Sequence, residues 1–451
     1  MDYHSALTYL NNYINYEAKP AKAYAPEKFN LNRVRDLLEL IDNPHLQYSS
    51  VHIAGTKGKG SVAAMTESVL RSASHVTGLY TSPHIHDLRE RIRVNGDIIS
   101  QESFAQLLTD LQPQIEATEH ITYYEIMTIL ALEWFARQRV EIAVLEVGLG
   151  GRLDATNVVT PSVCAITTIS YDHMDLLGNT IEDIASEKAG IIKTGIPIVS
   201  GPQSASALIV LEKHAISIKA PFVDSSKEWG WEHIESKFSS QLFAIWRVGQ
   251  HQNIYRHRIP LLGHHQIENV TIVTTIIDQL CQQGWNIPQS ALSTGLNQVK
   301  WPVRCEIFNC RPPILIDSAH NRASASQLNQ VLTDLFPKQK KVLIFGAMRD
   351  KDIKGMFAEL LPHCSHIVLT STGVPRSILP EELEVIAAGY DCPTTLENNI
   401  ENTLSTATKL AGSNGVVVVA GSITIAASIR LSVTSKPLYT TFRTPKQCYE
   451  Q

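Results

Sequence analysis

The feature that most constrains the fold is the alternation of short Val- and Ile-rich runs with stretches of helical spacing. Eight apolar runs read as strands: 49–55, 141–148, 161–169, 196–201, 313–319, 341–348, 366–372 and 415–421. Helical spacing is clearest over 61–73, 103–115 and 323–335. Continuous apolar strands that are separated by helices are typical of parallel sheets buried on both faces. The pattern therefore predicts an α/β protein with a mostly parallel central sheet.

Two segments break this alternation. Aromatic and polar residues alternate in 227–261, which predicts a small antiparallel patch. Between 295 and 313, Pro302, Pro312 and Pro313 interrupt the pattern before a new β-α-β series begins. We therefore expect two domains, a larger nucleotide-binding domain over 1–300 and a smaller α/β domain over 301–451.

The composition fits large buried cores and does not suggest a nucleic-acid partner. The 451 residues are 44% hydrophobic and 18% charged. The formal net charge is −5, so the protein as a whole does not carry the excess of positive charge that is typical of nucleic-acid-binding proteins. The seven cysteines are scattered, and only Cys305 and Cys310 are close in sequence, which predicts reduced thiols in a cytoplasmic protein. No run approaches the roughly 18 apolar residues of a membrane span, and the first residues are too polar for a secretory signal.

A glycine-rich loop follows the first strand. It reads AGTKGKGS, and it departs from the pattern G-x-x-x-x-G-K-[ST] because Gly60 separates Lys59 from Ser61. Gly55, Gly58 and Gly60 would still let backbone N–H groups face phosphate oxygens at a helix N-terminus. We expect Lys59 to neutralise phosphate and Ser61 to reach a metal ion. The alternative is an ordinary glycine-rich turn with solvated lysines.

Three more groups stand near the ends of predicted strands or in the helix that follows. Glu146 ends a strand, where a carboxylate can hold Mg2+. His173 follows the next strand, and Lys188 falls within a helical stretch. Taken singly, these could be a solvated carboxylate, a structural histidine and a solvated lysine. The N-K-x-D and D-F-G patterns of GTPases and kinases do not occur.

Longer motifs point to a family. They include AGTKGKGSVAAMTESVLR, LEVGLGGRLDATN, DHMDLLGNTIEDIASEKAGIIK, GHHQIEN, WPVR and DSAHN. In order and spacing, the chain resembles the folylpolyglutamate synthase/dihydrofolate synthase branch of the Mur ligase superfamily over nearly its whole length. The resemblance implies a P-loop-type ATPase domain, then a Rossmann-like domain that binds the incoming amino acid. We expect a monomer.

The resemblance also implies roles for individual residues. The ATP-binding positions are Gly55, Gly58, Lys59, Gly60, Ser61, Asn269, Arg304, Asp317 and His320. The magnesium-binding positions are Ser61, Ser82, Glu146 and His173. Lys188 matches a lysine that the family carbamylates with CO2. The groups expected to act in catalysis are Lys59, Lys188, His173 and Glu146.

The implied reaction adds L-glutamate to dihydropteroate or a reduced folate. ATP phosphorylates the acceptor carboxylate, and the amine of glutamate then attacks the acyl phosphate. Two anions must approach each other, so charge neutralisation and alignment supply much of the catalysis. Mg2+ would serve this purpose, although histidine is a softer ligand than Mg2+ usually takes. A carbamate on Lys188 would position a second Mg2+.

The chain departs from the family pattern at Val303, where Gly is usual, and at Ser318 and Arg322, beside the expected second-substrate pocket. The segment 12–44 occupies the region that would approach the pterin, and it could equally be a surface loop that leads into a helix. Two alternatives stay open. One is a Mur-type ligase that joins an amino acid to another carboxylate. The other is a catalytically silent folate- or nucleotide-binding protein.

Overall fold

The computed structural model describes residues 1–17, 29–250, 252–374 and 376–435. These residues form two compact units. The first comprises Met1–Glu232, Ala244–His257 and Ile267–Val299; the second comprises His233–Phe243, Arg258–Gln266 and the chain from Lys300 onward. The division into domains at residue 300 stays a prediction. Part of the predicted pterin-facing segment, 18–28, lies outside the described residues, as does Cys448.

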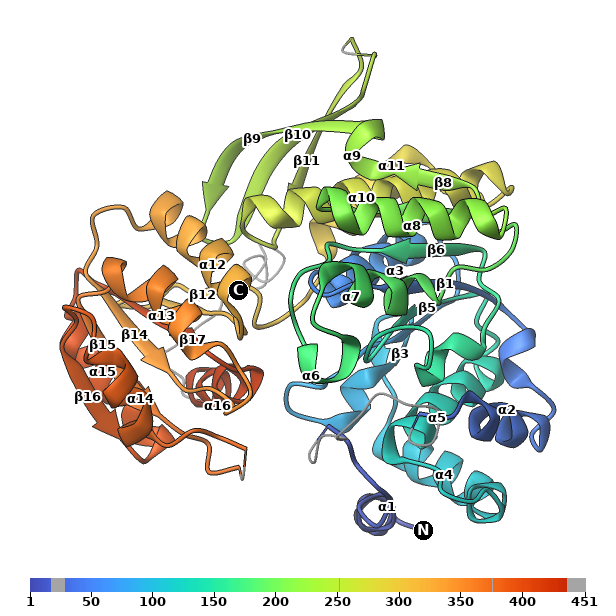
Figure 1. The fold of residues 1–451 in the computed structure, drawn as a ribbon, viewed down its shortest axis with the longest axis horizontal. Helices are drawn as coiled ribbons and strands as arrows, with labels where there is room; N and C mark the ends of the chain where they lie inside the picture. The colour runs from blue at the N-terminus through green and yellow to red at the C-terminus, as the bar shows by residue number, and fades with distance from the viewer. Residues whose placement is uncertain (18–28, 251, 375, 436–451) are drawn as a thin grey trace, which may run out of the picture. The chain divides into compact units, whose positions relative to one another are not determined.

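The first unit contains an eight-stranded sheet with the order β4-β3-β2-β5-β1-β6-β7-β8 (Figure 1). Pairing is parallel from β2 through β8, and β3 and β4 are antiparallel additions at one edge. The strands are β1 (Ser49–Ala54), β2 (Thr77–Tyr80), β3 (Ile92–Val94), β4 (Asp97–Ile98), β5 (Ile142–Glu146), β6 (Val163–Ile166), β7 (Ile198–Ser200) and β8 (Phe222–Asp224).

Helices connect these strands, and most begin at a residue whose side chain caps the first turn. Thr122 and Thr180 form capping boxes with Glu125 and Asp183. The helices are α1 (Tyr3–Leu10), α2 (Leu31–Glu39), α3 (Lys59–Ser72), α4 (Gln101–Ala117), α5 (Tyr123–Arg137), α6 (Met174–Leu177), α7 (Ile181–Ala189), α8 (Ala205–Ser217), α9 (Ser225–Glu228), α10 (His264–Gln282) and α11 (Gln289–Gln298). Short 3-10 helices are η1 (Pro44–Leu46), η2 (Leu88–Arg91) and η3 (Ala155–Val158).

Two apolar clusters pack against the sheet. Leu145 of β5 belongs to the cluster formed with α4 and α5, and Cys164 of β6 to the one formed with α7 and α8. Both residues pair with His52 of β1, so all three share one face of the sheet. The helix α3 contacts β1, β2 and β5, and α11 packs along α3.

The predicted antiparallel patch is confirmed. It consists of β9 (Trp229–Lys237), β10 (Ser240–Arg247) and β11 (Ile254–Ile259) in the order β11-β10-β9. Ser240 is reached from Lys237 through a short turn, which is the geometry of a hairpin.

The second unit contains a six-stranded sheet with the order β12-β13-β17-β14-β15-β16 (Figure 1). Only β12 runs antiparallel to its neighbour. The strands are β12 (Glu306–Phe308), β13 (Ile314–Ile316), β14 (Lys341–Phe345), β15 (His366–Thr370), β16 (Thr394–Glu397) and β17 (Val416–Ala420). The helices are α12 (Arg322–Leu335), α13 (Ile353–Leu360), η4 (Leu361–His363), α14 (Pro380–Ala387), α15 (Ile400–Ala411) and α16 (Ile423–Thr434).

All eight predicted strands are present, and the fold class is confirmed. The sequence did not reveal β2, β3, β4, β8, β12 or β16. The strand β2 is only four residues long, and its Gly78 lies against Phe135, so the usual β-branched pattern is missing. The edge strand β16 is only half buried along its length, which explains its mixed composition.

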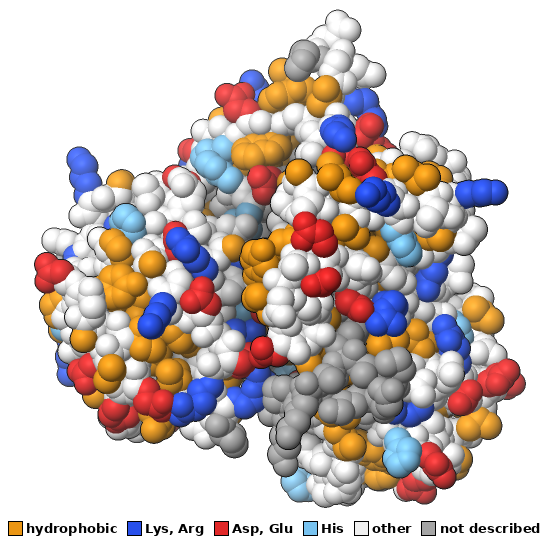
Figure 2. Space-filling view, viewed as in Figure 1, with side chains coloured by type: hydrophobic (Ala, Val, Ile, Leu, Met, Phe, Trp, Pro, Cys, Tyr) orange, Lys and Arg blue, Asp and Glu red, His pale blue; other side chains and the backbone are white. Residues whose placement is uncertain are grey.

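The surface agrees with the balanced charge of the sequence. Figure 2 shows Lys and Arg side chains interspersed with Asp and Glu on the visible face. Among the described residues, no helix combines the length and apolar character needed to cross a membrane. The six described cysteines are all free thiols.

Gly295 on α11 permits a close approach of two helices. A Cβ at this position would lie 2.4 Å from the Cα of Val69 on α3, and the Oγ of Ser68 donates to the Gly295 carbonyl at 2.8 Å. Because the obstructing atoms belong to backbone, Gly295→Ala should destabilise the protein by about 1–3 kcal/mol. Denaturant unfolding measures this change. Gly389→Ala, where the nearest atom lies 3.9 Å away, is the control. Equal effects of the two substitutions would contradict the packing account.

Candidate functional site

The loop after β1 has a shape that only glycine allows at two positions. Gly55 has φ +141° and Gly58 has φ +84°, both in the left-handed range. A Cβ on Gly55 would lie 1.8 Å from Oγ1 of Thr167, and one on Gly58 would lie 2.5 Å from Oδ1 of Asn269. The loop therefore lies directly against the segment after β6 and against α10.

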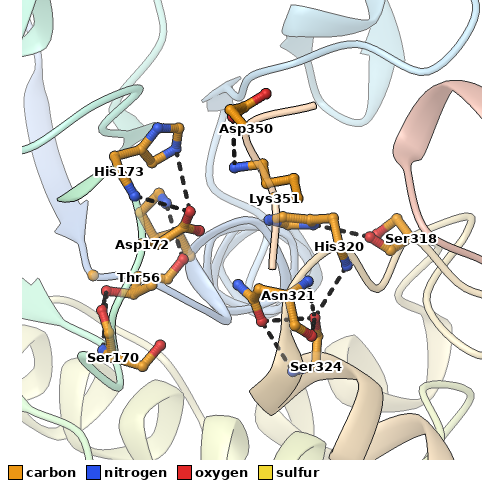
Figure 3. A network of polar contacts seen from close by, with 12 residues as sticks. Thr56, Ser170, Asp172, His173, Ser318, His320, Asn321, Ser324, Asp350 and Lys351 are labelled. Carbon is orange, nitrogen blue, oxygen red and sulfur yellow. Dashed lines mark hydrogen bonds and ion pairs between the residues drawn. The ribbon is translucent and has the colours of Figure 1, made fainter. Parts of the chain in front are cut away.

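Hydrogen bonds fix the loop to the chain that follows β6. The N–H of Thr56 donates to the Thr168 carbonyl at 3.1 Å. The hydroxyl of Thr56 donates to the Ser170 carbonyl at 3.1 Å and accepts from the Ser170 N–H at 3.1 Å. Figure 3 shows Thr56 and Ser170 joined in this way, with Asp172 and His173 a short distance along the same segment. The position of the loop and that of His173 are thus coupled.

Two lysines lie at the loop. The ammonium of Lys59 lies 3.4 Å from the Thr56 carbonyl, and that of Lys188 donates to the Gly55 carbonyl at 2.9 Å. Lys188 is only 4% exposed. Burial, and secondarily the charge of Lys59, lower the pKa of Lys188 to about 7. Near neutral pH, Lys188 therefore has a large fraction of neutral amine.

Ser61 lies in the first turn of α3, and its residue is 2% exposed. The N-cap residue, Gly58, has no side chain that could accept from the backbone N–H groups of this turn. A bound ligand would therefore not have to displace a capping side chain. With Lys59 as the first residue of the helix, the helix N-terminus and a cationic side chain lie together. Such an arrangement favours binding of an anion such as phosphate.

Glu146 and Ser82 meet at the end of β5. The Ser82 N–H donates to Oε2 of Glu146 at 3.1 Å, and Glu146 is 5% exposed. Ser82 follows β2, which pairs with β5, so the parallel sheet brings the two residues together. Carboxylate and hydroxyl oxygens are ligands that Mg2+ accepts.

A polar network that sequence reasoning missed holds the turn after Glu146. Asp154 accepts from the N–H groups of Gly148 and Leu149 at 3.0 and 2.9 Å, and from the hydroxyl of Thr156 at 2.5 Å. Thr156 contacts Nε2 of His52 at 2.8 Å. Burial raises the pKa of Asp154 and lowers that of His52 to about 3, so this histidine is neutral. The sequence signal was Asp154 followed two residues later by Thr156, which is typical of a cap.

His173 is less buried than the other first-unit candidates. Its side chain is 44% exposed, its φ is +50°, and its N–H donates to Oδ1 of Asp172 at 3.0 Å. Within the described parts of the chain, no three His, Cys, Asp or Glu side chains are placed to hold a metal ion together. A metal site here would need the serine hydroxyls or groups of a bound substrate.

The second unit brings Arg304, Asp317 and His320 together. Asp317 accepts from the Cys305 N–H at 2.8 Å, from the Cys305 thiol at 3.4 Å and from the Ala319 N–H at 2.7 Å. The guanidinium of Arg304 donates to the Ser318 hydroxyl. Nδ1 of His320 donates to the Ser318 carbonyl at 2.9 Å (Figure 3). The residue Ser318, a departure from the family pattern, thus contacts two of the three.

The other two departures also have a visible role or cost. Arg322 pairs with Glu359 at 2.9 Å between α12 and α13. Val303 is fully buried and has φ +53°, a conformation that glycine adopts freely but that costs a β-branched residue about 1–3 kcal/mol. This explains why Gly is usual at the position.

The structure therefore gathers the predicted residues of the first unit around one loop and one sheet edge, and those of the second unit around Asp317. Asn269, predicted on the adenine side, is 5% exposed and touches Gly58. The roles of all these residues stay predictions.

Gly58→Ala should impair nucleotide binding. Alanine would have to adopt φ +84° and displace Asn269, and a left-handed residue costs about 1–2 kcal/mol. We expect at least an approximately tenfold loss of affinity for ATP, measured by calorimetry. The matched control is Gly284→Ala, which has φ +95° but open space around it. Unchanged ATP affinity in Gly58→Ala would show that the loop is not the nucleotide site.

Comparisons with known proteins found two family models. The Mur ligase middle domain matches residues 53–277, and the Mur ligase glutamate ligase domain matches residues 303–423. The chain is 32% identical over 440 residues to the dihydrofolate synthase/folylpolyglutamate synthase of Bacillus subtilis strain 168, covering 95% of this chain and 98% of that protein. It is 33% identical over 405 residues to the protein of the same name from Mycobacterium tuberculosis, covering 84% and 82%.

Solved structures agree with these relatives. The folylpolyglutamate synthase of M. tuberculosis, complexed with ADP and AMPPCP, has a TM-score of 0.85 and 30% identity, covering 95% of this chain and 98% of that one. The apo form of the L. casei enzyme has a TM-score of 0.83 and 27% identity, covering 96% and 100%.

Proposed function

We infer the function from the family, because the chain belongs to the folylpolyglutamate synthase/dihydrofolate synthase family of Mur ligases. It is an ATP-dependent ligase that joins L-glutamate to the carboxylate of a folate or of dihydropteroate. The observation that carries this assignment is the 32% identity over 95% of this chain and 98% of the relative.

The first unit supplies the groups that ATP needs. Lys59 and the N-terminus of α3 would neutralise the phosphates, and the left-handed Gly58 lets the loop lie against Asn269. Asn269, which contacts the same glycine, would lie on the adenine side. Because the acceptor carboxylate and the γ-phosphate are both anions, a cationic, partly buried loop lowers the cost of bringing them together.

The oxygen ligands near the loop fit Mg2+. Ser61, Ser82 and Glu146 are hard oxygen donors, and the buried carboxylate of Glu146 would hold its charge best with a cation nearby. His173, whose side chain is 44% exposed and offers a nitrogen ligand, fits Mg2+ less well than these oxygen donors. A bound Mg2+ would neutralise charge on the transferring phosphoryl group.

Lys188 is suited to carbamylation. CO2 adds to a neutral amine, and the pKa of Lys188, lowered to about 7, supplies that form near neutral pH. Addition of CO2 to the neutral amine releases one proton and leaves an anion, which is attracted to Lys59 where the protonated amine would be repelled. The anion could then position a second metal ion.

In the second unit, Arg304, Asp317 and His320 would act on ATP and the incoming glutamate. We further propose a monomer that binds small molecules and no nucleic acid, consistent with the net charge of −5. The six free thiols support a cytoplasmic location.

Glutamate-dependent release of ADP from ATP tests the function. We expect release with dihydropteroate or tetrahydrofolate as acceptor and none without an acceptor. Release only with an unrelated carboxylic acid would replace the folate assignment with another Mur-type ligation. Equal inactivity of wild type and Lys59→Ala with every acceptor would support a catalytically silent binding protein.

The two charged residues of the ATP site should each be essential. Lys59→Ala and Glu146→Ala should each lower turnover by at least about 100-fold, because each removes a charge contact to the transferring phosphoryl group. Steady-state ADP release measures this, with Lys219→Ala as a control. Lys219 lies on a surface turn and has no predicted role. Near-normal turnover in either variant would remove that residue from the mechanism.

The carbamate of Lys188 should form as the pH rises. The neutral amine exists above its pKa of about 7, so the 13C NMR signal of a carbamate from labelled bicarbonate should be weak at pH 6 and strong at pH 8. Lys188→Ala should lose the signal and regain part of its activity with short carboxylic acids. The same acids should not rescue Lys59→Ala. Rescue of neither variant, together with no signal in wild type, would exclude the carbamate.

A further inference from the structure

The turn that carries Arg304 has an unusual backbone. Val303 and Cys305, on either side of Arg304, have φ values of +53° and +47°, both left-handed. Both residues are buried, and Val303 is β-branched, so neither adopts this conformation without cost. Strained backbone persists only where surrounding contacts hold it, and it tends to occur at functional sites.

The contacts that hold Val303 come from Glu306. The Val303 N–H donates to Oε2 of Glu306 at 3.1 Å. The same carboxylate accepts from Nε and a terminal nitrogen of Arg430 on α16 at 2.8 and 3.2 Å. Arg430 thereby fixes the carboxylate with two hydrogen bonds, and the carboxylate fixes the strained residue. Without Glu306, a buried N–H and a guanidinium would both lose their partner.

The other side of the turn leads to the candidate site. The Val303 carbonyl accepts from the Ser318 N–H and from the Arg304 guanidinium, each at 3.1 Å. The Cys305 N–H and thiol both donate to Asp317. The direction of the Arg304 side chain therefore depends on the left-handed backbone that Glu306 maintains, whereas Asp317 is also held by the Ala319 N–H.

We propose that Glu306, fixed by Arg430, is a positioning residue for the ligase reaction, because it holds the strained Val303 turn that directs Arg304. The inference rests on the proposed function, in which Arg304 acts on ATP. The contacts of Glu306 described above are with Val303 and Arg430, so in this proposal its effect passes through Arg304.

Kinetics of Glu306→Ala test the proposal. Misdirection of Arg304 should lower kcat/KM for ATP by about 10- to 100-fold, while KM for the folate acceptor stays the same. The matched control is Glu359→Ala, which breaks the exposed ion pair with Arg322 on the same unit and should change kcat/KM by less than about threefold. Inactivity of the wild type would count against the proposed function. If the wild type is active and Glu306→Ala has the same kcat/KM for ATP, only the present inference is overturned.

Two double variants separate positioning from general damage. In an Arg304→Ala background, Glu306→Ala should cause little further loss, because its effect acts through the missing guanidinium. Glycine accepts the left-handed conformation freely, so Val303→Gly should restore part of the activity that Glu306→Ala loses. We expect this restoration even if Glu306→Ala alone folds poorly, because glycine at position 303 removes the backbone strain that the Glu306 carboxylate offsets. An undiminished loss in the Arg304→Ala background, or no restoration by Val303→Gly, would overturn the proposal.

Discussion

Parallel hydrogen bonding of β1 to β5 on one side and to β6 on the other brings three chain segments to the same edge of the first sheet. Ile53 pairs with Glu146, and Ala54 pairs with Ile166, so the glycine-rich loop, Glu146 and the segment that leads to His173 leave the sheet together. Gly55 then lies so close to Thr167 that no side chain fits between them. A one-residue change of register would reverse the faces of β1 and separate these groups, so the site depends on this pairing.

The same edge concentrates charge where water is scarce. Lys188 is buried beside Lys59, and its pKa falls to about 7 because the protonated form loses hydration and meets a like charge. Glu146 is buried one strand away and accepts a backbone N–H. In the proposed function, a triphosphate bound by the lysines and a metal ion bound by the carboxylate would stabilise this arrangement of charges. We therefore propose that this placement of charges is what favours the binding and activation of ATP.

The fold class and most strands could be predicted because buried parallel strands leave continuous apolar runs such as 415–421. The place of the glycine-rich loop between a strand and a helix could be predicted, because glycine adopts left-handed backbone freely, while the roles of its residues stay predictions. The network of His52, Thr156 and Asp154 could not, since a lone histidine in an apolar strand shows no partner in the sequence. The left-handed turn at Val303 was equally hidden, because a valine predicts extended backbone. The contacts to Glu306 and Ser318 that sustain it come from tertiary structure.

The central claim is that the loop holds ATP in order to activate a carboxylate. Isotope transfer tests it most directly, with an acceptor whose γ- or pteroate carboxylate carries 18O, incubated with the enzyme, ATP and glutamate. The account predicts that one 18O atom per turnover appears in inorganic phosphate, because the acyl phosphate keeps the carboxylate oxygen when the amine displaces phosphate. Amide formation with unlabelled phosphate would contradict the acyl-phosphate route and the role assigned to the loop.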